Sequence, residues 1–101
     1  MKSRWDKLSI AMKVQDVPAC VRELKLHGLV KDGAEEQTFV ITEKAACLID
    51  EAMRQMRKRY PKASEGDVKF RALIFIVLHE MGNAVRDYLP VYVSILNSLT
   101  E

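Results

Sequence analysis

The sequence predicts an α+β protein in which a small N-terminal antiparallel β-sheet or hairpin precedes two main α-helices and a short C-terminal helix. Apolar and polar residues alternate in the first third of the chain, which is typical of half-buried strands. Two long apolar-patterned segments follow and are separated by Pro61. The second contains an unbroken apolar run from Ala72 to Leu78. Because a helix that is apolar nearly all round needs cover on every side, we expect it to pack against a second copy in a dimer.

The length of 101 residues allows a single domain. We expect it to span residues 1–101, with a β-rich head over about 7–42 and a helical part over about 43–101. The composition is 49% hydrophobic and 30% charged, which is ordinary for a globular protein. The net charge of +2 does not indicate a general affinity for polyanions.

The N-terminal segment shows the period of two that defines a half-buried strand. Apolar and polar side chains alternate from Leu8 to Val14, and a second alternation runs from Val21 through Leu24 to Leu26. The sequence Lys31-Asp32-Gly33 then predicts a turn before a β-prone stretch from Gln37 to Thr42. These segments predict an antiparallel sheet of two or three strands.

The same residues also fit helical spacing, so periodicity alone leaves two alternatives open. Ala11, Val14, Val21 and Leu24 could lie on the buried faces of two short helices, over Leu8 to Val14 and Pro18 to His27. We predict strands here.

The first main helix should begin between Glu35 and Thr42 and end near Arg59, because Pro61 cannot continue it. Its last turn is basic, which suits the negative end of the helix dipole. A stripe of small and sulfur-containing residues marks the side expected to pack under the sheet: Ala45, Ile49, Ala52, Met53, Met56 and Tyr60.

The second main helix should begin at Ser64, whose hydroxyl can accept a hydrogen bond from a free backbone amide, and continue to about Met81. Gly82 predicts its end. A short final helix is expected between Val91 and Leu99, after the break or bend caused by Pro90.

No set of residues indicates an enzyme, a metal site or a cofactor. His79-Glu80 lacks the second histidine of the zinc-protease pattern, since position 83 is asparagine, and His27 is the only other imidazole. Neither Cys20 nor Cys47 has a histidine or an acidic residue at the sequence spacing of a catalytic nucleophile and its base. No Gly-rich phosphate loop is present either.

Both cysteines are expected to be buried thiols in a reducing compartment, because they lack metal or redox spacing. The longest apolar run is far shorter than the roughly 20 residues needed to cross a bilayer. We therefore expect a cytoplasmic protein that makes no membrane contact.

The helical part resembles a known family. Residues 45–56 read AACLIDEAMRQM, and they are followed by Arg59-Tyr60-Pro61, a capped start at Ser64 to Asp67, the pair Ala72-Leu73, and His79-Glu80. This pattern resembles the ZapA family of bacterial cell-division proteins, in which a hairpin precedes a helix of the form AAxxIDxxMRxM and a second, apolar-striped helix. The resemblance covers about residues 22–81.

The resemblance implies a non-enzymatic homodimer, or a tetramer made from two dimers, that binds and cross-links filaments of the division protein FtsZ. Several weak heads on one rigid body would bridge neighbouring filaments through a high effective concentration. The implied filament contacts are Lys31, Glu51, Arg54, Arg57, Glu65 and Asp67. The residues expected at the interface between copies are Ala72, Leu73, Phe75, Ile76 and His79.

A second class competes with this reading. Gly28-Leu29-Val30, the turn at Asp32-Gly33 and the segment Phe39 to Lys44 resemble the wing of a winged-helix DNA-binding regulator. On that reading Pro18 to His27 would enter the major groove, Lys31 and the wing would meet phosphates, and the later helices would dimerise two heads about one DNA turn apart. DNA is a partner only in this alternative. Strands over Leu8 to Leu26 would favour the division protein, whereas helices would favour the regulator.

Overall fold

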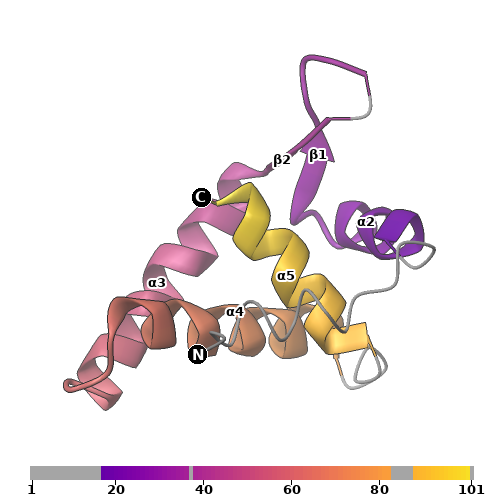
Figure 1. Cartoon of the computed structure of the whole chain (residues 1–101). Helices are drawn as coiled ribbons and strands as arrows, with labels where there is room; N and C mark the ends of the chain where they lie inside the picture. Colours follow the sequence, from indigo (N-terminus) through magenta and orange to yellow (C-terminus); the bar gives the residue numbers. More distant parts are fainter. Residues whose placement is uncertain (1–16, 37, 83–87, 101) are drawn as a thin grey trace, which may run out of the picture.

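The computed structural model describes residues 17–36, 38–82 and 88–100 and confirms the predicted α+β class. Figure 1 shows a two-stranded hairpin that projects from a body of helices. The described elements, in chain order, are α2 (Val17–Leu26), β1 (Val30–Asp32), β2 (Phe39–Ile41), α3 (Glu43–Arg59), α4 (Glu65–Met81) and α5 (Leu89–Leu99).

The helix α5 holds the described parts of the molecule together. It packs against α4, α2 and β2, and in Figure 1 it passes between the hairpin and the α3–α4 pair. Its buried residues include Tyr92, Val93 and Leu96. The core therefore joins the N-terminal segment to the helical part, so the expected head and helical part share one apolar interior.

The segment before the hairpin corrects the prediction. Val17–Leu26 is an α-helix, so the strand expected over Val21 to Leu26 is wrong. Cys20, Val21 and Leu24 are the buried residues of α2, and their spacing puts them on one helical face. Leu26 misled the period-two reading because it is apolar yet 73% exposed. The strand predicted over Leu8 to Val14 lies outside the described residues.

The predicted hairpin is confirmed, with shorter strands than expected. Val30 faces Ile41, Lys31 faces Val40 and Asp32 faces Phe39 across the antiparallel pair. Lys31 and Val40 share the exposed side, because paired residues lie on the same face of a sheet.

Gly33, at the end of β1, lies very close to Thr38. A β-carbon there would lie 2.4 Å from Thr38 Oγ1. The Gly33 amide also donates to the Thr38 carbonyl at 2.8 Å, so the two chains are held close at this point.

The two main helices match the predicted bounds closely. α3 begins directly after Thr42, whose Oγ1 accepts a hydrogen bond from the Ala45 amide, and ends at Arg59 as predicted. α4 begins after Ser64, whose Oγ accepts from the Asp67 amide at 3.2 Å. It ends before Gly82, which has a φ of 74°.

The chain covers most of the apolar surface of α4 by itself. Six of its side chains are buried against neighbouring elements: Val68, Ala72, Leu73, Ile76, Val77 and Met81. The helices α3 and α5 supply much of this cover. Phe75 is the exception on α4, with 51% of its surface exposed.

The final helix begins two residues earlier than predicted. Pro90 lies in its first turn, where no backbone amide is needed for an intrahelical bond, so it starts α5 instead of bending it. The predicted burial of the cysteines is confirmed for Cys20 and wrong for Cys47, which is exposed on α3.

Candidate nucleic-acid interface

The junction between α2, the hairpin and α3 is fixed by hydrogen bonds around Thr42. Its hydroxyl donates to the Gly28 carbonyl at 2.6 Å, and its amide donates to the Leu29 carbonyl at 3.1 Å. Gly28 has a φ of 73°, which favours glycine. The Leu29 amide in turn donates to the Leu24 carbonyl at 3.0 Å, so the end of α2 and the start of α3 are tied to the same turn.

The helix α2 presents a free face to solvent. Its buried side packs on α5 and β1, while the opposite side exposes Pro18, Ala19, Arg22, Glu23 and Leu26. Arg22 is the exposed cation of this face. The guanidinium group is suited to phosphate oxygens and to the major-groove edge of guanine.

Lys25 bridges α2 and the hairpin. Its ammonium group bonds Asp32 Oδ1 at 2.5 Å and lies 4.8 Å from the centre of the Phe39 ring. These two contacts hold the ammonium group where α2 meets the hairpin. A groove of about 410 Å³ lies at this junction of α2 and the hairpin. It is lined by Val17, Pro18, Val21, Arg22, Lys25 and Phe39.

The charge of this surface is mixed. Residues 17–36 and 38–44 contain four cations and five carboxylates, a balance of −1: Arg22, Lys25, Lys31 and Lys44 against Glu23, Asp32, Glu35, Glu36 and Glu43. Lys44 is engaged by the His27 carbonyl at 3.2 Å and by Glu80 at 3.4 Å. The surface is therefore unsuited to strong contact with phosphates regardless of sequence.

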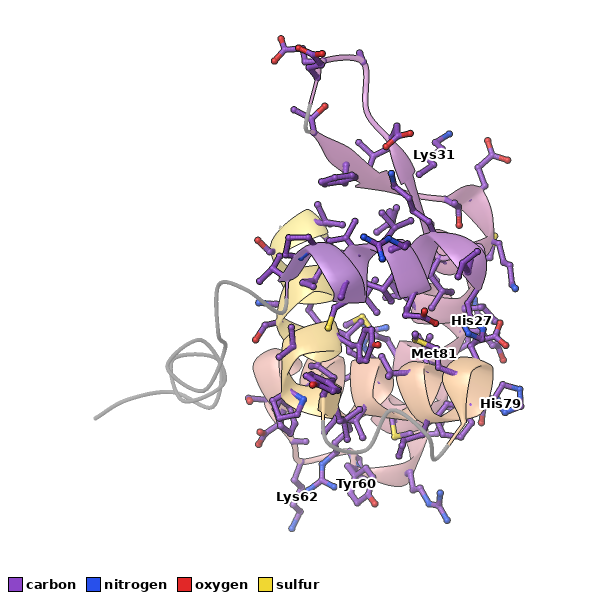
Figure 2. All side chains as sticks on the ribbon, turned by 90° about the vertical axis from the view of Figure 1, so that its right-hand side faces the viewer. His27, Lys31, Tyr60, Lys62, His79 and Met81 are labelled. Carbon is purple, nitrogen blue, oxygen red and sulfur yellow. The ribbon has the colours of Figure 1, made fainter. Side chains whose placement is uncertain are left out.

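A second group of cations lies at the far end of the molecule, where α3 turns into α4. Figure 2 shows Lys31 on the hairpin and Lys62 at the opposite end. Arg54 pairs with Glu51 at 2.7 Å within α3. Within the described residues, three exposed cations of this group make no ion pair: Lys58, Arg59 and Lys62.

Arg57 and Glu65 join α3 to α4 at this end. Both guanidinium contacts to the carboxylate are hydrogen bonds, with Nε at 3.0 Å and Nη2 at 2.9 Å. Hydrogen bonding by Arg57 lowers the pKa of the Glu65 carboxyl, and Glu65 raises the pKa of the guanidinium. The pair is exposed, so solvent screening limits its contribution to stability.

Tyr92 joins α5 to α2 inside the core. Burial, and after it the neighbouring Cys20 side chain with which it hydrogen bonds, raise the pKa of its phenol to about 12. This contact helps to fix the buried side of α2.

The residues predicted as filament contacts do not gather in one place. Lys31 is exposed on β1, remote from the α3–α4 end at which Arg57 and Glu65 meet. Glu51 and Arg54 pair with each other on α3, and Asp67 is half-buried in the first turn of α4.

The residues predicted at the interface between copies divide into two groups. Ala72, Leu73 and Ile76 lie in the core of the chain itself. Phe75 and His79 are exposed, and their rings stack with centres 5.7 Å apart and planes 5° apart. Figure 2 shows His79 projecting from the edge of α4.

The sequence analysis did not identify the contacts of Lys25 with Asp32 and Phe39. The signal was present, because Asp32 and Phe39 are cross-strand partners in the hairpin. The contacts were missed because Lys25 was assigned to a strand and not to a helix beside that hairpin.

Within the described ranges, no group of three or more histidine, cysteine or acidic side chains could hold a metal ion. None of the described helices is both long and apolar enough to cross a bilayer. Comparisons of the chain with protein-family models, with curated proteins and with solved structures each found no match. The site must therefore be interpreted from its own geometry.

Proposed function

We propose that this protein binds double-stranded DNA through α2 and the β1–β2 hairpin, as a regulator of the winged-helix kind. The helical state of Val17–Leu26 is the observation that supports this most directly, because helix and strand discriminate between the two classes considered from sequence. The order of a short helix, a hairpin and a longer helix fits a reading helix followed by a wing.

In this arrangement α2 lies in the major groove. Arg22 points away from the core and is the residue best suited to contact a base edge or a phosphate. Lys31 lies on the exposed side of the hairpin and meets the DNA backbone. The Thr42 hydroxyl bond to Gly28 keeps the helix and the hairpin in a fixed relation, which a two-part contact requires.

The mixed charge of this surface predicts how DNA affinity depends on salt concentration. Lys25 is paired with Asp32, so Arg22 and Lys31 remain as the backbone contacts, and the logarithm of the binding constant should fall with the logarithm of the salt concentration with a slope of about −2. Binding should therefore depend on the base sequence more than on total charge.

The proposal is tested by selecting duplexes from a random pool and measuring affinity by fluorescence anisotropy at physiological salt. We expect an enriched sequence that binds more tightly than its scrambled form. Arg22→Ala should weaken that complex by about 1–3 kcal/mol. Arg54→Ala removes another exposed cation, from α3, and should leave affinity unchanged. Failure to enrich any sequence, or equal loss in both variants, would refute the proposal.

Filament binding remains a second proposal. The order of hairpin, α3 and α4 supports it, because the ZapA resemblance implies a hairpin ahead of two helices. Co-sedimentation with FtsZ polymers tests it directly, and Glu51→Lys combined with Arg54→Glu, which reverses one paired site, should reduce the pelleted fraction. Absence of the wild-type chain from the pellet would rule this function out.

A further inference from the structure

A groove of about 600 Å³ lies between α3 and α4, and all of its lining residues belong to these two helices. Its volume lies within the range of small-molecule sites, which is about 300–1,000 Å³. Phe75 and His79 line it together, with ring centres 5.7 Å apart and nearly parallel planes. Further apolar side chains come from both helices: Leu48, Ala52, Met56 and Ile76. The groove therefore presents a largely apolar surface to a ligand.

Two ion pairs fix the direction of α4 along α3. Lys44 in the first turn of α3 pairs with Glu80, and Arg57 in its last turn pairs with Glu65. The two helices are therefore antiparallel, which places Phe75 beside the N-terminal half of α3. The aromatic rings thus mark one end of the groove.

Cations mark the opposite end. Lys58 and Arg59 line the groove at the C-terminal end of α3. Arg59 lies about 16 Å along the helix from Leu48, at a rise of about 1.5 Å per residue. Neither cation makes an ion pair within the described part of the chain. Both are exposed and available to an anion.

The acidic side chains that line the groove are already compensated. Glu51 accepts from Arg54 at 2.7 Å and from the Gln55 amide at 3.1 Å. Glu80 pairs with Lys44 at 3.4 Å, and only 20% of its side chain is exposed. The uncompensated charge of the groove is therefore positive and lies at the end that is remote from the aromatic rings.

We propose that this groove binds a single-chain carboxylate, the chemical class to which fatty acids belong. The chain lies on the apolar surface between the two helices, and the carboxylate accepts hydrogen bonds from Arg59 and Lys58. A guanidinium group can donate to both carboxylate oxygens at once, and the ammonium group adds a second positive charge. A nucleic acid, which is charged at every unit, would leave the apolar part of the groove unused.

The length of the groove sets the length of the chain. An extended chain advances about 3.6 Å for every three bonds, so the distance of about 16 Å corresponds to about thirteen bonds. A carboxylate of about twelve carbons therefore reaches from Arg59 to the aromatic end. A much shorter chain would leave Phe75 and Leu48 in water.

The proposal does not depend on DNA binding. This groove has no residue in common with the groove between α2 and the hairpin. A chain that binds the carboxylate but no DNA, or the reverse, would separate the two proposals.

Titration calorimetry of the full chain with dodecanoate, kept below the concentration at which it forms micelles, gives the first test. We expect one saturable site, with an affinity about tenfold higher than for octanoate because four more methylene groups are partly buried. Dodecyltrimethylammonium has the same chain with the opposite charge and should bind at least about tenfold more weakly. Equal affinity for the two charged forms, or no saturable binding of dodecanoate, would overturn the proposal.

A pair of double variants tests the cationic end. Lys58→Gln with Arg59→Gln should weaken dodecanoate binding about tenfold, with helical circular dichroism retained. Lys31→Gln with Lys62→Gln changes the net charge equally but removes exposed cations outside the groove, so it should bind as the wild type does. An equal loss in both variants would reduce the effect to net charge and contradict the site.

Two methionines of α3 locate the ligand in the wild type, so this measurement needs no variant. Met56 lines the proposed site, whereas Met53 lines a separate groove of about 520 Å³ beside β2 and α5. Contacts between the dodecanoate chain and the Met56 methyl group should appear as intermolecular nuclear Overhauser effects, with none to the Met53 methyl group. Contacts to Met53 alone, or to neither methyl group, would refute the placement.

Discussion

The Thr42 hydroxyl donates a hydrogen bond of 2.6 Å to the Gly28 carbonyl and also accepts one from the Ala45 amide. One side chain therefore caps α3 and fixes the turn between α2 and the hairpin. Residues fourteen apart in sequence are joined in this way. A DNA contact made by both α2 and the hairpin depends on this geometry.

Thr42→Val should lower the free energy of unfolding by about 1–2 kcal/mol, because it removes the cap of α3 and leaves the Gly28 carbonyl without its donor. Urea denaturation followed by circular dichroism measures this. Thr38→Val is the matched control, since the Thr38 hydroxyl bonds only the Glu35 carbonyl in an exposed turn. A loss in the control equal to that of Thr42→Val would contradict the role assigned to Thr42.

Gly33→Ala should distort the hairpin. The new β-carbon would lie 2.4 Å from Thr38 Oγ1, and that hydroxyl is held by its bond to the Glu35 carbonyl. We expect a loss of about 1–3 kcal/mol and shifted amide resonances in β1 and β2. Gly66→Ala in the first turn of α4 has its nearest contact at 3.9 Å and should be neutral or slightly stabilising. Unshifted strand resonances in Gly33→Ala would show that the hairpin tolerates a side chain there.

The pair of Arg57 and Glu65 should make stability depend on pH in the acid range. The pKa of Glu65 is lowered in the folded chain from its usual value of 4.5, so the folded state binds the proton less readily than the unfolded state. The contribution of the pair is present above the unfolded pKa and is lost as pH falls through the folded pKa. Glu65→Gln should be less stable than the wild type at neutral pH, and the two should converge in acid. A difference that persists below the folded pKa would exclude the ion pair as its cause.

Tyr92 should titrate in the alkaline range when the chain is folded. Burial raises its pKa to about 12 from the usual value of 10.0. Because the folded pKa lies above the unfolded one, the stability contributed by the neutral phenol is complete below about pH 10 and is lost between these two values. The difference in phenolate absorbance between wild type and Tyr92→Phe isolates this group. Ionisation of Tyr92 near its usual pKa in the folded chain would contradict its burial against Cys20.

Much of the helical part could be predicted from the sequence, because single residues set the ends of its helices. Ser64 caps α4, Pro61 follows the end of α3, and Gly82 ends α4, because each residue acts on the backbone within a few positions. The turn before the β-prone stretch was predicted for the same reason. These expectations were correct because local chemistry alone determines them.

The state of Val17–Leu26 depended on contacts that a single sequence does not display. Leu24 and Leu26 alternate in the manner of a strand, but only Leu24 meets the core. The packing of α2 on α5 and β1 selects the helix, because it buries Cys20, Val21 and Leu24 together. Long-range contact therefore overrode the period-two pattern.

By itself the sequence determined the fold class, the C-terminal end of α3, the bounds of α4 and the position of the hairpin, since caps, prolines, glycines and runs of apolar residues act locally. Only the tertiary structure decided that α2 is a helix, that α3 and α5 cover most of α4, and that Phe75 stays exposed. Burial of a side chain depends on which distant elements approach it. That choice is made by the whole folded chain.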